Sequence, residues 1–210
     1  MARPRKDQMI DIPARAIQET IRLLGERDAA ALTMNAVADA VGCRAPALYN
    51  HFRNKNALLR AVHDAGFQRL YANKLAVAAR TGGDALARLR EGGLAYLRFA
   101  RDNPALYRLM FDPPPLPELS ANPFQEDVGR RSLDFLRASI EACQAEGYLP
   151  GRDPALVAFT LWSTVHGAAD LLIQQRAPQP AMATEQLIIA TVDTVMGMVA
   201  ATRIAQSRTQ

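Results

Sequence analysis

Cysteine is scarce in this chain of 210 residues, and histidine is hardly more frequent. The two cysteines, Cys43 and Cys143, lie in different segments and match neither a metal-binding nor a redox spacing. The three histidines, His51, His63 and His166, are too scattered to form a metal site. We therefore predict no metal and no cofactor, and we expect both cysteines to be reduced, as in a cytoplasmic protein.

Long apolar runs are also missing. No window approaches the roughly 20 consecutive apolar residues of a membrane span, so we expect no membrane insertion. The opening residues Met-Ala-Arg-Pro-Arg-Lys carry charge without a following apolar core, which does not fit a secretory signal. Hydrophobic residues make up 49% and charged residues 22% of the chain, the balance of a folded soluble protein.

Strand patterns are nearly absent, whereas helical periodicity runs through the whole chain. The pattern predicts an all-α protein with about nine helices. We expect these helices at residues 13–24, 34–41, 46–52, from 55 onward, 84–101, 104–111, 124–146, 153–175 and 184–205. The five prolines within residues 112–123 predict an irregular loop there.

The net positive charge is confined to one end of the chain. Residues 1–60 hold ten Lys and Arg against six Asp and Glu, whereas the other 150 residues hold 15 of each sign. This basic segment contains the stretch CRAPALYNHFRNK, residues 43–55, which has no Asp or Glu. This split indicates a polyanion-binding end joined to a neutral body, although a solvated basic face would give the same numbers.

Two short helices in this basic end have the spacing of a helix-turn-helix. Thr33 is a suitable N-cap for the first and Gly42 a suitable stop. Ala38 leaves room for close packing, and Leu48 supplies the apolar anchor from the second helix. The predicted exposed face of the second helix carries Ala45, Ala47, Tyr49, Asn50 and His51.

The stretch LTMNAVADAVGCRAPALYNHFRNKNALLRAV, residues 32–62, resembles the DNA-binding domain of TetR-family transcriptional regulators. A later stretch, LWSTVHGAADLL, residues 161–172, resembles the Trp-x-x-x-His-Gly element of one C-terminal domain type in that family. The resemblance implies a three-helix DNA-binding domain over residues 1–62 and a regulatory and dimerisation domain over residues 63–210. It also implies a dimeric repressor that binds a palindromic operator and responds to a small molecule.

Three residues match positions that contact the DNA backbone in the family, and for a fourth, Thr33, helix-end chemistry allows a phosphate contact, with a plain N-cap as the alternative. Tyr49 and His51 each present a donor on a rigid ring, and Lys55 matches a phosphate-binding lysine. Thr33, at a helix N-terminus, can donate its hydroxyl to phosphate while it caps the helix. For Tyr49 and His51 packing within the domain is the alternative, and for Lys55 it is simple solvation.

Base contacts are expected from the same helix. Arg44 can bind guanine through two hydrogen bonds, and Asn50 can read adenine or touch phosphate. Ala47 replaces a hydroxyl residue common in the family and can meet a thymine methyl group. Ala45 is a poor N-cap before Pro46, so we expect DNA phosphate to complete this helix end.

The last two predicted helices are rich in apolar residues. The helix at 153–175 is apolar nearly all round, and the helix at 184–205 carries a wide apolar stripe. By resemblance they pair with their mates in a homodimer, and burial within one protomer is the alternative.

The resemblance implies an effector site in the larger domain. Because no charged cluster is visible there, we expect an apolar or aromatic ligand. The candidate lining residues, each of which can instead be plain core, are Tyr71, Tyr96, Phe99, Tyr107, Phe111, Trp162 and His166. A protein partner in place of a small ligand is the alternative. Ser163, His166 and Asp170 imitate a catalytic triad, but three side chains along one helix rarely reach that geometry, and we predict no enzyme and no catalytic residue.

Overall fold

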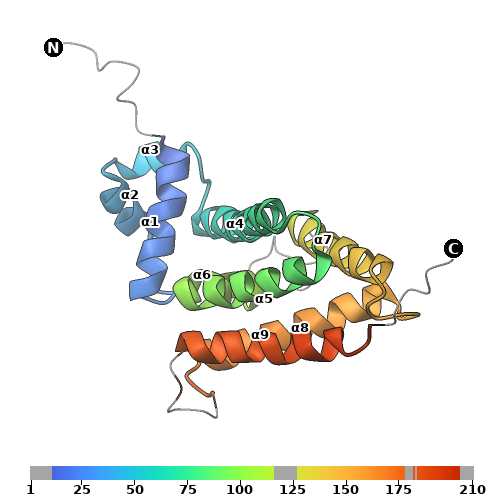
Figure 1. The fold of residues 1–210 in the computed structure, drawn as a ribbon. Coiled ribbons are helices and arrows are strands. Elements are labelled where there is room, and N and C mark those ends of the chain that lie inside the picture. Colours follow the sequence, from blue (N-terminus) through green and yellow to red (C-terminus); the bar gives the residue numbers. More distant parts are fainter. Residues whose placement is uncertain (1–10, 116–126, 178–181, 183, 204–210) are drawn as a thin grey trace, which may run out of the picture. The chain divides into compact units, whose positions relative to one another are not determined.

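The computed structural model describes residues 11–115, 127–177, 182 and 184–203, and it contains no strand within these ranges. The prediction of an all-α chain is confirmed (Figure 1). The described residues form nine helices: α1 (Ile12–Glu26), α2 (Met34–Val41), α3 (Ala45–Tyr49), α4 (Lys55–Thr81), α5 (Ala85–Asp102), α6 (Pro104–Phe111), α7 (Asp127–Ala145), α8 (Pro154–Ile173) and α9 (Thr184–Ala200). Of the predicted proline-rich loop only residues 112–115 are described, and these are not helical.

The chain divides into two compact units. The first combines residues 1–67 with 105–123, and the second combines residues 68–104 with 124–210. Helix α4 therefore contributes its first half to one unit and its second half to the other, and α6 belongs almost entirely to the first unit. The domain boundary expected after residue 62 lies within α4.

The ends of the first two helices follow from capping residues. Asp11 accepts a hydrogen bond from the Ala14 N–H at 3.1 Å and caps α1. Thr33 caps α2 as predicted, because its Oγ1 accepts from the Ala36 N–H at 3.2 Å. Gly42 ends α2 with φ +80°, a left-handed conformation that favours glycine.

Helix α3 begins one residue earlier than predicted and is shorter. The N-cap is Arg44, whose backbone is extended, so Ala45 is the first helical residue and not the cap. The expectation of a weak cap at Ala45 is therefore wrong, and Pro46 takes the second helical position, where its missing N–H costs no helix hydrogen bond. The Arg44 side chain makes no capping hydrogen bond.

The core of the first unit fixes α3 in place despite its single turn. Leu48 is fully buried where α3 packs against α1 and α2, together with Val37 and Ala38 of α2. Asn54 caps α4 through a 2.8 Å hydrogen bond from the Ala57 N–H. A five-residue helix is too short to be stable alone, so these tertiary contacts hold its exposed face in position.

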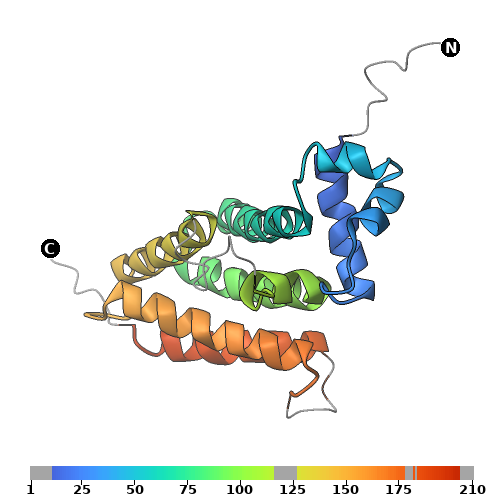
Figure 2. The same ribbon diagram turned by 180° about the vertical axis from the view of Figure 1, so that it is seen from behind.

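In the second unit, α5 is the central helix. It packs against α7, α8 and α9, and Figures 1 and 2 show it between α8 and α9 on one side and α7 with the second half of α4 on the other. A Cβ atom at Gly93 would lie 3.3 Å from both methyl groups of Val192, so glycine permits the close approach of α5 and α9. Cys143 is buried in this core as a free thiol, and burial raises its pKa from 9.0 to about 11.

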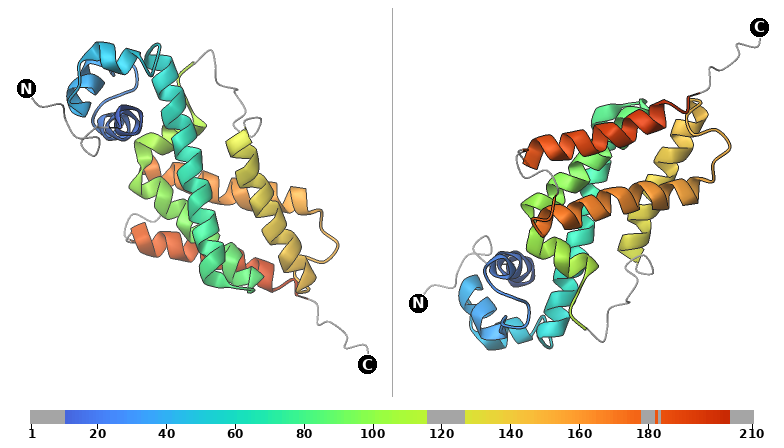
Figure 3. Two further views of the ribbon diagram at one scale, coloured as in Figure 1. Left: turned by 90° about the horizontal axis from the view of Figure 1, so that it is seen from above. Right: turned by 90° about the horizontal axis from the view of Figure 1, so that it is seen from below.

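The remaining side of the second unit is formed by α8 and α9, which run alongside each other (Figure 3). Only 11% of the most apolar stretch of α8 is buried, and Leu156 and Phe159 are 63% and 58% exposed. Met198 on α9 is 67% exposed. By length and composition alone, α8 is long and apolar enough to cross a membrane, which is also true of core helices in soluble proteins.

Candidate DNA-binding surface and ligand cavity

The first unit presents a recognition surface, which we define as the exposed residues Thr33, Arg44, Pro46, Tyr49, Asn50 and His51 with the half-buried Ala45 and Ala47. Tyr49 is 48% exposed although it adjoins the fully buried Leu48. Leu48 therefore anchors α3 in the core, and Tyr49 projects from α3 to the surface. The surface contains no acid, so it can approach phosphate without like-charge repulsion.

Thr33 keeps a free donor while it caps α2. Its Oγ1 accepts from Ala36, and the hydroxyl hydrogen can still be donated outward from an exposed position. Capping and phosphate binding use different parts of the hydroxyl group, so the two roles are compatible. The contact with phosphate stays a prediction.

Lys55 has a role that the sequence did not indicate. Its Nζ donates to the main-chain carbonyls of Ala29 and Ala30 at 3.1 and 3.0 Å, and so ties the turn between α1 and α2 to the start of α4. An ammonium group has three donors, which leaves one for a DNA phosphate. The acceptors are main-chain atoms far away in the sequence, so no residue pattern could have revealed them.

A cavity lies in the second unit, bordered by α4, α5, α7, α8 and α9. Its volume is about 80 Å³, space for several waters. The lining is mostly apolar and aromatic: Lys74, Val77, Arg88, Leu89, Gly92, Gly93, Tyr96, Phe135, Leu136, Ser139, Leu161, Trp162, Val165, Val192, Val195 and Met196.

Three of the predicted ligand residues meet beside this cavity. The Tyr96 hydroxyl lies 3.1 Å from His166 Nδ1 and accepts a hydrogen bond from Trp162 Nε1 at 3.3 Å. The Trp162 and His166 rings stack with their centroids 4.7 Å apart. Tyr96 and Trp162 line the cavity itself, whereas His166 contacts both of them without being part of the lining. Burial lowers the pKa of His166 and so favours the neutral imidazole. The negative charge of Asp170 acts in the opposite direction but is the weaker effect.

The other predicted ligand residues do not line the cavity. Tyr71 packs edge-on against the lining residue Phe135, beneath the Arg131 guanidinium. Phe99 is buried in the second unit. Tyr107 and Phe111 belong to the first unit and pack against each other, with the half-buried Phe111 also against the buried Phe67.

The resemblance to a catalytic triad has no counterpart in the geometry. His166 Nδ1 faces Tyr96, and Asp170 accepts from the Gln174 side chain at 2.7 Å. His166 is thus oriented by a phenol and a stacked indole, an arrangement that fits a binding cavity.

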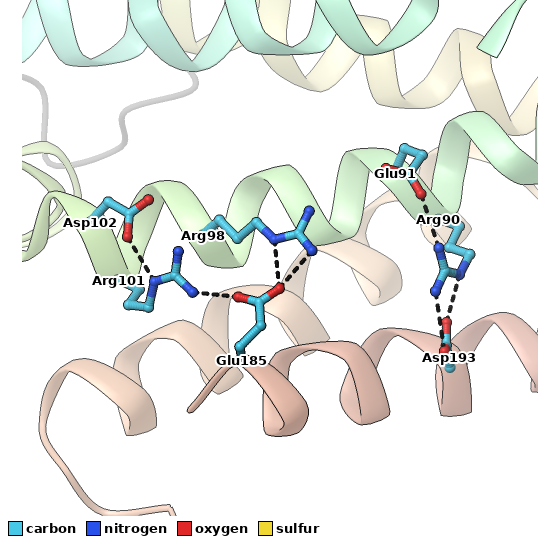
Figure 4. A network of polar contacts seen from close by, with 7 residues as sticks. All are labelled: Arg90, Glu91, Arg98, Arg101, Asp102, Glu185 and Asp193. Carbon is cyan, nitrogen blue, oxygen red and sulfur yellow. Dashed lines mark hydrogen bonds and ion pairs between the residues drawn. The ribbon is translucent and has the colours of Figure 1, made fainter. Parts of the chain in front are cut away.

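Ion pairs join α5 to α9 along their length (Figure 4). Arg90 contacts Asp193 at 2.6 Å, and Arg98 contacts Glu185 at 2.6 Å. Arg101 also pairs with Glu185. The hydrogen bond from Arg98 is the main cause of the lowered pKa of Glu185, as the bond from Arg90 is for Asp193. These contacts fix α9 against α5.

A helix-turn-helix unit with an acid-free exposed helix, followed by a helical unit with an internal cavity, defines the class of DNA-binding regulators with a separate regulatory domain. The family model described as "Bacterial regulatory proteins, tetR family" matches residues 16–62, and the one described as "Tetracyclin repressor-like, C-terminal domain" matches residues 89–195. The chain belongs to the TetR family and is a DNA-binding transcriptional regulator, not an enzyme.

Solved structures share this fold. A protein of unknown function from Rhodococcus sp. is 22% identical, with TM-score 0.78, over 94% of this chain and 100% of that one. The TetR family transcriptional regulator PfmR from Thermus thermophilus is 22% identical, with TM-score 0.67, over 87% and 97%. The ketosteroid transcriptional regulator KstR2 of Mycobacterium tuberculosis is 17% identical, with TM-score 0.64, over 91% and 96%. No curated protein matches the chain.

Proposed function

We propose that the protein is a homodimeric repressor that binds a palindromic operator through the recognition surface and leaves it when a small ligand enters the cavity. The observation that carries the proposal is the acid-free face of α3, held rigidly by Leu48 and carrying Arg44, Tyr49, Asn50 and His51. A protein that binds bacterial DNA works in the cytoplasm, where we place it.

The dimer follows from the size of one recognition surface. A single helix-turn-helix reads only a few base pairs, so specificity requires two of them on a two-fold site. The exposed apolar residues Leu156, Phe159 and Met198 lie on α8 and α9 and supply the self-complementary face that a two-fold contact needs. A Cβ atom at Gly167 or Gly197 would meet no atom within 4 Å, so both glycines leave space for a partner helix to come close.

The oligomeric state tests this part of the proposal. Phe159→Asp on α8 should give a monomer in sedimentation velocity, because it buries an unpaired charge in the interface. Leu75→Asp is the matched control, since Leu75 is an exposed apolar residue of α4, and this variant should remain a dimer. Two dimeric variants would contradict the proposed interface.

The ligand half of the proposal depends on the cavity. A control by a protein partner would need no internal space, whereas this cavity is lined by aromatic and apolar side chains and lies beside helices of the proposed dimer interface. A ligand that fits the cavity better in the DNA-free arrangement would lower operator affinity by linkage.

DNA binding is tested by fluorescence anisotropy on an operator selected from random oligonucleotides. Arg44→Ala should cost about 1–3 kcal/mol and relax the preference at one base pair, because Arg44 is the expected base reader. Tyr49→Phe should weaken binding to all sequences alike, because a phosphate contact carries no base information. Variants with unchanged affinity would contradict the assigned roles.

A further inference from the structure

Two cations line the otherwise apolar cavity. Lys74 comes from the second half of α4 and Arg88 from the first turns of α5. No Asp or Glu is among the described residues of the lining. Two positively charged side chains therefore line the cavity, and no described lining residue carries a countercharge.

Lys74 is held by a neutral partner. Its Nζ donates to the main-chain carbonyl of Ser132 at 2.7 Å, and it makes no ion pair within the described residues. Burial lowers the pKa of Lys74 from 10.5 to about 8, because a carbonyl dipole only partly replaces the water that the ammonium group has lost.

Arg88 is incompletely bonded. Its Nη2 donates to the Gly82 carbonyl at 2.8 Å, whereas its buried Nε has no acceptor among the described residues. Two acids lie at the same end of α5, but their carboxylates accept from main-chain N–H groups: Asp84 from Ala87 at 2.8 Å and Glu146 from Ala85 at 3.1 Å. Neither is ion-paired with Arg88 in the described part of the chain.

Lys74 and Arg88 are both half-buried. Charges that are withdrawn from water in proteins are normally paired, because removing an ion from water is costly unless an opposite charge replaces the water. A ligand can supply that charge here. The aromatic and aliphatic residues Leu89, Phe135, Trp162 and Val192 form the rest of the wall and favour an apolar ligand body.

We propose that the effector is an amphipathic monocarboxylic acid, with an apolar or aromatic body in the cavity and a carboxylate bound by Lys74 and Arg88. The inference rests on the proposed ligand function and narrows it to one chemical class. A guanidinium group matches the planar carboxylate with parallel donors, and the Lys74 ammonium adds a further charge-assisted hydrogen bond. The body remains mainly apolar, as expected from the sequence, and the anionic head is added.

Trp162 provides the assay, because it is the only tryptophan of the chain and lines the cavity. Decanoate and naphthoate are titrated against its emission, each beside its neutral amide, decanamide or naphthamide. The acids should bind roughly 10-fold or more tightly than the amides, which lack the charge-assisted bonds. Lys74→Met should reduce acid affinity roughly 10- to 100-fold and leave the amides unchanged. Arg80→Gln, which removes an exposed cation of α4, is the control and should leave both unchanged.

The outcomes separate this inference from the proposed function. Amides that bind as tightly as the acids, or acid binding that survives Lys74→Met and Arg88→Met alike, would overturn the inference and leave a ligand cavity in place. No response of Trp162 to any of the four compounds would count against both. Amide binding by the variants shows that the cavity is still folded, so a misfolded variant cannot imitate the expected result.

Discussion

Replacement of Lys74 by methionine should make the protein more stable at neutral pH, although it removes a hydrogen bond to Ser132. Methionine keeps a long, unbranched stem that can fill the same space, and it lacks the charge. The reason for the gain is that the folded protein removes the Lys74 ammonium group from much of the water and gives it a carbonyl oxygen, but no carboxylate, as its hydrogen-bond partner.

The magnitude follows from the pKa of Lys74, which burial lowers from 10.5 to about 8. One pKa unit corresponds to 1.36 kcal/mol, so the buried charge costs about 3 kcal/mol of the free energy of unfolding at pH 7. Loss of the hydrogen bond to Ser132 offsets about 1 kcal/mol. The expected net gain is about 2 kcal/mol, or an increase in Tm of roughly 4–8 °C for a chain of this size.

The gain should depend on pH in one direction. Lys74 has a lower pKa in the folded than in the unfolded state, so the cost is fully present below pH 8. Between pH 8 and 10.5 the folded protein releases the proton first, and the wild type recovers stability relative to the variant. Above pH 10.5 the advantage of Lys74→Met should have disappeared.

Differential scanning calorimetry at matched protein concentrations, from pH 7 to above pH 10.5, measures this difference. Every other titrating group is common to both proteins, so its contribution cancels, and Arg80→Met controls for the loss of one cation. A variant that is less stable than the wild type at pH 7, or a difference that does not change with pH, would refute the reasoning about Lys74.

Three further predictions concern the fold. In calorimetry, Lys55→Met should lower the free energy of unfolding by about 1–3 kcal/mol, because two main-chain carbonyls lose an ammonium donor. The control Arg44→Ala should change it by less than about 0.5 kcal/mol. Equal effects of the two variants would contradict the role given to Lys55. In a urea titration, Gly66→Ala should lower the free energy of unfolding by about 1 kcal/mol, because its Cβ would lie 2.6 Å from Met110 Sδ and this overpacking exceeds the gain in helix propensity. The control Gly25→Ala, whose Cβ would meet no atom within 4 Å, should not destabilise the protein in the same titration. Glu185→Gln should make Tm less sensitive to acid. Because folding lowers the pKa of Glu185, its carboxylate contributes stability above its unfolded pKa, and this stability is lost as pH falls through its folded pKa. Parallel profiles of Tm against pH for variant and wild type would contradict this prediction.

The sequence predicts the first unit well because its signals are local. Thr33, Gly42 and Asn54 cap or end helices through their own side chains or backbone, so their roles can be read from neighbouring residues. The start of α3 was misplaced by one residue because the sequence rule favours capping side chains, and Arg44 caps without one.

The cavity was less predictable because its lining comes from five helices that are distant in the sequence. Trp162 and Tyr96 stood out as aromatic residues, but so did Tyr107 and Phe111, which pack against each other in the first unit. Lys74 gave no sign of its position, since a lysine in an amphipathic helix is usually solvated. Only tertiary packing places its ammonium group in an apolar cavity.

The central claim is that two recognition surfaces read a two-fold DNA site. Selection of oligonucleotides from a random pool by the purified protein, followed by sequencing, tests it most directly. We predict an inverted repeat, bound with an affinity that falls steeply as salt rises, because Lys and Arg contacts release counterions from phosphate. A pool without an enriched motif, or an enriched single site without an inverted copy, would contradict the claim.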